Sequence, residues 1–123
     1  MALTTDVRSA RGESEQQAVV AVITLAFSTD PMARWTFPDP ATYMRVWPEV
    51  VRAFGDKGFA HGAAHLAAGG AAAAMWLPPD VHPDTERLTP LIGQHAAREQ
   101  RADLDRVFAE METYHPSERC WYL

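Results

Sequence analysis

The stretch GFAHGAAHLAAGGAAAAMWLPP, residues 58–79, decides how the rest of the chain is interpreted. Alanine favours helix, so the composition of this stretch alone would predict a helix. Gly69-Gly70, however, is a strong two-residue turn signal between two apolar arms, and Pro78-Pro79 ends the second arm. We therefore predict a β-hairpin here, against the helix propensity of its alanines.

Two helices are predicted before the hairpin. Ser14 and Gln17 have the spacing of a capping box, and a helical face follows, so the first helix should cover residues 15–27. The apolar residues of that face are Val19, Val22, Ile23, Ala26 and Phe27. A short strand is expected ahead of this helix, at residues 7–11.

The second helix should begin at Asp39-Pro40, because this pair combines an N-cap with a proline at the first helical position. Its buried face is predicted from Tyr43, Trp47, Val50, Val51 and Phe54, and Gly55 is the expected stop. Pro48 predicts a kink, or two short helices that meet near Trp47. Asp30-Pro31, earlier in the connection, is interpreted as a turn.

The rest of the chain predicts two helices and a strand. A short helix is expected at residues 85–93, and a clearer one is marked by Leu104, Val107, Phe108 and Met111. The final run, Cys120-Trp121-Tyr122-Leu123, is apolar and aromatic, as in a strand that enters a core.

Composition limits the classes of function. The chain has 123 residues, 47% of them hydrophobic, which suits one domain. Its net charge is −5 with scattered basic residues, which disfavours nucleic acid and mildly favours cationic ligands such as amines. Cys120 is the only cysteine, and His61 and His65 lack a third ligand nearby, so no metal is expected. With no signal core and no apolar stretch of membrane-spanning length, we expect a cytoplasmic protein without a membrane partner.

A set of short motifs carries a family resemblance along nearly the whole chain. They are, in order, Ala26-Phe27, Asp30-Pro31, Arg34-Trp35, Pro38-Asp39-Pro40, Ala74-Met75-Trp76-Leu77-Pro78-Pro79, His115-Pro116 and Trp121-Tyr122-Leu123. This ordered set resembles the front half of a GNAT-type N-acetyltransferase. The resemblance implies an α+β, GNAT-like (acyl-CoA N-acyltransferase) fold: short strand, two helices, hairpin, helices and the start of a further strand. Residues 1–123 would then form a single, incomplete domain that stops as the fourth strand begins.

The resemblance implies acetyl-CoA as the co-substrate of the full-length family. In that family the segment after the fourth strand carries the signature Gln or Arg, two residues, Gly, one residue, then Gly or Ala, whose backbone N–H groups hold the pyrophosphate. That segment is absent here, and the seven glycines form no other phosphate-binding loop. We therefore expect weak or no acetyl-CoA binding by this chain alone.

The implied reaction transfers acetyl from acetyl-CoA to an amine of a small-molecule acceptor, with a carboxylate as general base. The front half of a GNAT protein generally shapes the acceptor side, through the loop between its first helices and through the hairpin. The substrate-binding candidates are Asp30, Arg34, Trp35 and Asp39 from the loop and Met75 and Trp76 from the hairpin. Asp30 or Asp39 could pair with a cationic amine. The resemblance assigns no catalytic residue, because the family tyrosine that often protonates the thiolate lies further downstream.

Each candidate also has a structural explanation. Turn formation and helix capping account for Asp30 and Asp39, a surface ion pair with one of them accounts for Arg34, and core packing accounts for the tryptophans. A second functional class also stays open: a non-catalytic module, built on the truncated fold, that binds a small ligand or a protein. Self-association through the exposed C-terminal strand would fit a severed sheet.

Overall fold

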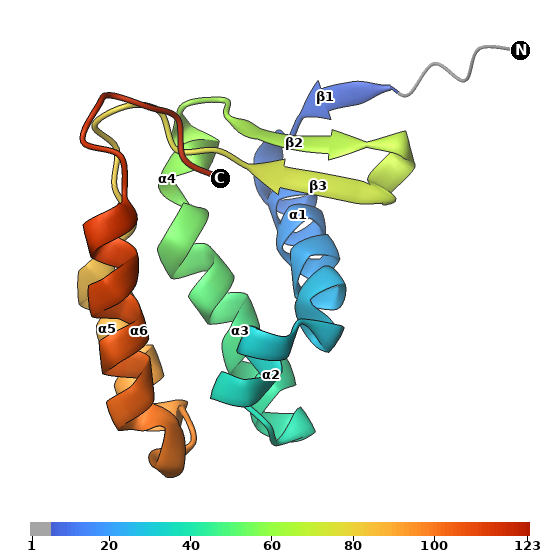
Figure 1. The fold of residues 1–123 in the computed structure, drawn as a ribbon. Helices are drawn as coiled ribbons and strands as arrows, with labels where there is room; N and C mark the ends of the chain where they lie inside the picture. The colour runs from blue at the N-terminus through green and yellow to red at the C-terminus, as the bar shows by residue number, and fades with distance from the viewer. Residues whose placement is uncertain (1–5) are drawn as a thin grey trace, which may run out of the picture.

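The computed structural model describes residues 6–123, which form an α+β fold with a three-stranded antiparallel sheet at one end (Figure 1). The strands are β1 Val7–Ser9, β2 Ala64–Ala67 and β3 Ala72–Met75. The α-helices are α1 Gly12–Ala26, α2 Pro31–Thr36, α3 Pro40–Gly55, α4 Lys57–Ala60, α5 Thr85–His95 and α6 Arg101–Tyr114. Three 3₁₀ turns complete the order: η1 Phe27–Thr29, η2 Ala68–Gly70 and η3 Arg98–Gln100. None of these helices is long and apolar enough to cross a membrane.

The predicted hairpin is confirmed. β2 pairs with β3 from Ala64 opposite Met75 to Ala67 opposite Ala72, and the turn between them has positive φ at Ala68, Gly69 and Gly70. Glycine adopts this left-handed conformation without a steric cost, so the glycine pair stops a helix from running through the alanines. The predicted first strand is also confirmed, because β1 adds to the other side of β2 and gives the order β1-β2-β3.

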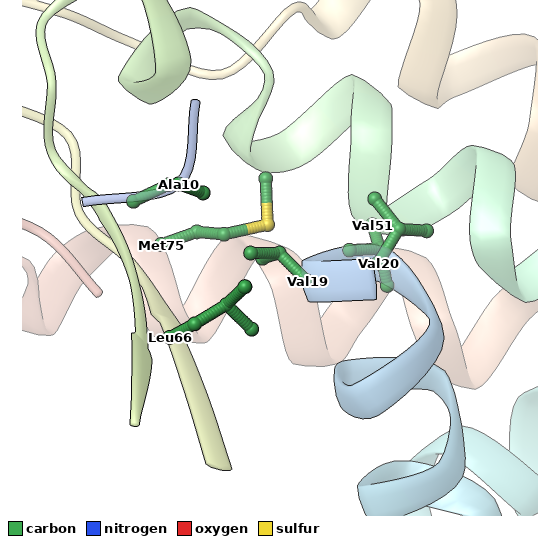
Figure 2. Packing of buried hydrophobic residues seen from close by; sticks show 7 residues of the cluster. Ala10, Val19, Val20, Val51, Leu66 and Met75 are labelled. Carbon is green, nitrogen blue, oxygen red and sulfur yellow. The ribbon is translucent and has the colours of Figure 1, made fainter. Parts of the chain in front are cut away.

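α1 packs under the sheet and forms the first hydrophobic core (Figure 2). Val19 and Val20 lie against Leu66 and Met75 of the hairpin, with Val51 of α3 beside them. The predicted buried face of α1 is only partly right: Val19 is buried, whereas Ala26 and Phe27 are exposed. Thr24 is buried instead, because its hydroxyl donates to the Val20 carbonyl oxygen at 2.7 Å and is thereby satisfied.

The predicted capping box at Ser14 is wrong. α1 begins earlier, at Gly12, and no side chain caps it. The Glu15 carboxylate accepts from the Arg11 N–H at 3.3 Å and also binds the Arg8 guanidinium of β1. Those two contacts, the Arg8 contact foremost, lower the pKa of Glu15. A carboxylate in the first turn thus replaces the capping hydroxyl and joins the helix to the sheet.

The connection from α1 to α3 contains a helix that was not predicted. Asp30 was interpreted as part of a turn, but it is the N-cap of α2, and its carboxylate accepts from the Ala33 N–H at 2.9 Å. Asp39 caps α3 as predicted, accepting from the Thr42 N–H at 2.8 Å. α3 is one helix with Pro48 inside it, so the alternative of two separate helices is wrong.

The second hydrophobic core joins helices to one another, away from the sheet. Phe37, Tyr43 and Val46 meet Leu104 of α6 there, with partly buried side chains of α5 around them. The predicted helices after the hairpin are therefore confirmed, with α5 two residues longer than expected, 85–95 against 85–93. Of the four apolar residues that marked α6 in the sequence, only Leu104 is buried.

The predicted strand at the C-terminus is only begun. Tyr122 and Leu77 exchange two backbone hydrogen bonds, of 2.7 and 2.9 Å, in a single antiparallel bridge beyond β3. Trp121 and Leu123 are 56% and 63% exposed, so the expectation that this run enters the core is wrong. A single bridge attaches this run to the rest of the chain, and no other element covers the side chains of Trp121 and Leu123 among the described residues.

Close approach of α4 to the end of the hairpin yields the first prediction. A Cβ added at Gly58 would overlap the Trp76 carbonyl oxygen, a backbone atom that has little freedom to move. We expect Gly58→Ala to lower the free energy of unfolding by about 1–3 kcal/mol in urea titrations. Gly93→Ala is the control, since its Cβ meets nothing within 4 Å and should stabilise exposed α5 by about 0.5–1 kcal/mol. Equal urea midpoints for Gly58→Ala and the unmodified chain would contradict the close approach.

Candidate functional site

The structure separates the six candidate residues into two groups. Asp30, Arg34, Trp35 and Asp39 lie around α2 at the far end of α1, whereas Met75 and Trp76 lie at the end of β3 (Figure 1). α1 contains 15 residues, which is about 22 Å of helix, between the two groups. We name the first group with its connection, residues 28–43, the capped loop.

Arg34 holds the capped loop together through backbone carbonyls. Its guanidinium donates to the carbonyl oxygens of Ser28, Phe37 and Pro38 at 3.2, 3.4 and 3.0 Å. It also lies over the Tyr43 ring, 5.3 Å from the centroid. The suggested surface ion pair with an aspartate does not occur among residues 6–123. Arg34 is thus a clamp for the loop, a role that one ammonium could not fill because it lacks the planar fork.

The two aspartates of the capped loop both serve as helix caps, as the structural explanation proposed. The Thr42 N–H, and then the Thr42 side chain, bind the Asp39 carboxylate and hold its pKa below the usual range. Asp30 is partly buried, and only its Oδ2 accepts a hydrogen bond within the described part of the chain. Its Oδ1 is therefore open to an additional donor, and so is the exposed carboxylate of Asp39.

Tyr43 ties the capped loop to α1. Its hydroxyl donates to the Thr24 carbonyl oxygen at 2.6 Å, and only 1% of the residue is exposed. Burial raises the pKa of the Tyr43 phenol, an effect that the nearby Arg34 guanidinium opposes and the Asp30 carboxylate reinforces. This phenol is held as a neutral structural donor, away from solvent.

The hairpin candidates are largely occupied by packing. Met75 is buried at 8% exposure between the sheet and α1, and its methyl group lies against Gly55 of α3. Trp76 is partly buried and donates its backbone N–H to the Ala63 carbonyl oxygen at 3.0 Å. Trp35 is also partly buried, against the second core, and it lines an open groove along α6.

A pocket that was not predicted lies near the Leu77–Tyr122 bridge. It has a volume of about 440 Å³ and is formed by the loop after β3, the end of α3 and the segment after α6. We name it the proline pocket, because Pro78, Pro83 and Pro116 line it. Its floor is aromatic: the Tyr122 ring lies 5.5 Å from Phe54 and 5.2 Å from His115.

Charged groups surround the proline pocket. Arg119 donates to one carboxylate oxygen of Asp80 at 2.8 and 2.9 Å, and Asp80 has a left-handed backbone with φ of 68°. Glu112, Glu118 and the imidazole of His82 also line the pocket. A pocket lined by both aromatic rings and charged groups can bind a small ligand of mixed polarity. Within residues 6–123 no group of three or more His, Cys, Asp or Glu side chains could hold a metal ion.

Comparison with family models, with curated proteins and with solved structures found no match for this chain. The capped loop and the proline pocket are the two places considered for binding of a small molecule. The first was indicated by two Asp-Pro pairs close together in sequence. The second had no such signal, because its walls come from three distant segments.

Removing the Arg34 clamp should loosen the capped loop. Arg34→Ala leaves three carbonyls without their donor and should lower the free energy of unfolding by about 1–3 kcal/mol. Arg34→Lys should recover only part of that loss. Arg45→Ala is the matched control, since Arg45 is exposed and makes no hydrogen bond in the described residues, and it should change stability by less than about 0.5 kcal/mol. Urea unfolding followed by tryptophan fluorescence measures all three, and equal effects of Arg34→Ala and Arg45→Ala would rule the clamp out.

The lowered pKa of Asp39 predicts a pH dependence of stability. Because the folded pKa lies below the unfolded one, the carboxylate contributes stability above about pH 4, and this is lost as the pH falls through the folded pKa. Asp39→Asn keeps a capping oxygen but does not titrate. The stability advantage of the unmodified chain over Asp39→Asn should shrink on acidification, as unfolding curves at a series of pH values would show. An advantage that is the same at neutral and at strongly acidic pH would be inconsistent with this assignment.

Proposed function

We propose that this chain forms the acceptor side of a GNAT-type N-acetyltransferase, which transfers acetyl from acetyl-CoA to an amine of a small molecule. The observation that carries the proposal is the strand pairing: β1 adds to a β2–β3 hairpin across intervening helices, and Tyr122 begins a further strand next to β3. That order agrees with the one implied by the motifs from Ala26 to Leu123. We also propose that this α+β fold is of the GNAT type.

The acceptor amine would be bound at the capped loop. Asp30 Oδ1 and the Asp39 carboxylate give this loop negative charge, which attracts a protonated amine. The amine must lose a proton before it attacks the thioester, and a nearby carboxylate can accept that proton through water. Arg34 is positioned by its three carbonyl contacts, so its part is to hold the shape of the loop.

Acetyl-CoA supplies the acetyl group, and its pyrophosphate needs successive backbone N–H groups in a glycine-rich loop. The seven glycines of the sequence lie at positions 12, 55, 58, 62, 69, 70 and 93 and do not form such a loop. The residues present therefore do not fit the pyrophosphate. The part assigned to this chain is acceptor binding.

The test uses two samples: the 123-residue chain and the polypeptide containing it that is isolated from its source cells, with its intact mass recorded. Calorimetric titration of the 123-residue chain with acetyl-CoA should give no micromolar binding. The cellular polypeptide should release free CoA thiol when supplied with acetyl-CoA and a panel of small amines. Failure of the cellular polypeptide to bind acetyl-CoA or to acetylate any amine would overturn the proposal.

Helix caps provide a matched comparison for the acceptor site. Asp30, Asp39 and Asp84 each cap a helix, and asparagine retains that cap in all three. In the active polypeptide, Asp30→Asn or Asp39→Asn should raise the KM for the amine, with little change in the KM for acetyl-CoA. Asp84→Asn, at the start of α5, should leave both KM values unchanged. An equal effect of all three substitutions would point to stability rather than to amine binding.

The proline pocket favours a second candidate, a non-catalytic module that binds a small ligand. Its aromatic floor and charged opening suit a ligand with an apolar body and a polar end. Tyr122→Leu should weaken the binding of such a ligand, since it removes the ring between Phe54 and His115. Fragment screening by NMR would identify this class if shifts gather at Tyr122 and not at the capped loop.

A further inference from the structure

α6 is amphipathic, yet most of its apolar face is not covered. Leu104 is its only buried residue, and it packs against the side chains of α5 and α3. Phe108, Met111 and Tyr114 are 40%, 49% and 82% exposed. Large exposed side chains gathered on one helix, rather than scattered, are typical of an interaction surface.

A mainly apolar groove runs along the adjoining side of α6, and it shares Met111 and Tyr114, but not Leu104 or Phe108, with the exposed apolar face. Its volume is about 1000 Å³, and we name it the α6 groove. Val107, Met111 and Tyr114 line it from α6, and Trp35 of α2 lines it from the body of the protein. The lining positions on α6 run from Asp103 to Tyr114, about three helical turns. An open, mainly apolar groove of that length beside a helix fits a second helix, whose side chains enter it at every third or fourth position.

The charges on α6 restrict which helix fits. Of the charged side chains of α6, only Asp103, Arg106 and Glu110 line the groove, whereas Arg101, Asp105 and Glu112 do not. Asp103 and Arg106 form an ion pair with each other at the edge of the groove, whereas Glu110 at the same edge has no ion-pair partner in the described residues. A second copy of α6 would bring an equal Asp103–Arg106 pair and a second Glu110, so its groove-lining charges would not complement those already there. A helix with Lys or Arg beside its apolar stripe would instead be attracted.

We propose that the α6 groove binds a basic amphipathic helix of a partner protein, with Trp35, Met111 and Tyr114 as its apolar contacts and Glu110 as its charge contact. Tryptophan, tyrosine and methionine are the side chains enriched at the centres of protein interfaces. This inference shares Trp35 with the capped loop and Met111 with the proline pocket, but it requires neither the Asp30 and Asp39 carboxylates nor acetyl-CoA. It can hold or fail whatever the outcome of the acetylation assay.

The test uses two fluorescein-labelled helical peptides of the same length as α6. Both peptides have leucine along one face. One has lysine and the other has glutamate at every polar position. Fluorescence anisotropy with the full chain should give micromolar binding of the lysine peptide and binding weaker by about tenfold or more for the glutamate peptide. A dissociation constant above about 1 mM for the lysine peptide, or equal affinities, would overturn the proposal.

Two pairs of variants locate the binding. Tyr114→Ser, in the groove, should weaken the lysine peptide about fivefold, whereas Leu25→Ser, 75% exposed on α1, should not. Glu110→Gln should weaken it and reduce its salt dependence, whereas Glu86→Gln on α5 should not. Equal effects within either pair would overturn the assignment of the groove. So would a concentration-dependent dimer in sedimentation velocity that Tyr114→Ser abolishes, because the groove would then be covered by a second copy.

Discussion

The rest of the structure depends on Trp47 of α3, because its side chain packs against both hydrophobic cores. Its ring stacks on Tyr43 with 5.6 Å between ring centroids, meets Phe37 edge-on at 6.1 Å and is tilted against Phe27 at 5.5 Å. Each such aromatic pair contributes about 0.5–1.5 kcal/mol beyond the burial of its area. The Trp47 Nε1–H is buried without a hydrogen-bond partner in the described residues, at a cost of about 1–3 kcal/mol. Three aromatic contacts and the burial of the ring outweigh that cost. The same packing, on two sides of α3, keeps the helix continuous through Pro48, which would break an unsupported helix.

Small residues set how closely the helices approach the sheet. Gly55 and Gly58 sit where α3 and α4 meet the end of the hairpin, and a Cβ at Gly55 would lie 2.6 Å from the Met75 methyl carbon. Ala64 is almost fully buried on the hairpin side of the same contact. The alanine-rich composition of the hairpin is thus suited to close layers rather than to a helix. That is why a propensity scale, which measures the isolated chain, points the wrong way here.

What the sequence could predict were the elements with a local cause. Gly69-Gly70 disfavours a helix and favours a turn, so the hairpin follows from neighbouring residues. Asp39-Pro40 combines a cap with a fixed φ, so the start of α3 does as well. Asp30-Pro31 is the same cap signal, but α2 has only six residues, too few for an apolar period to appear. The buried side of α1 depends on Tyr43, whose hydroxyl donates to the Thr24 carbonyl oxygen on that side. Tyr43 lies 19 residues further along the chain than Thr24. The proline pocket needs Phe54, Pro83 and Tyr122 to meet, and no local pattern predicts such a meeting.

The candidate surfaces differ in how much of their chemistry is already used by the fold. In the capped loop, Arg34 binds three carbonyls and both aspartates cap helices, so what remains for a ligand is Asp30 Oδ1 and the exposed side of the Asp39 carboxylate. On α6 the balance is reversed, since one buried leucine attaches the helix and its other large apolar side chains are free. An element with few buried contacts opens at a lower free energy than the core, and anything that binds only its folded form stabilises it. α6 is therefore a part of the described chain whose stability would respond to a partner, whereas the capped loop is fixed by contacts within the chain.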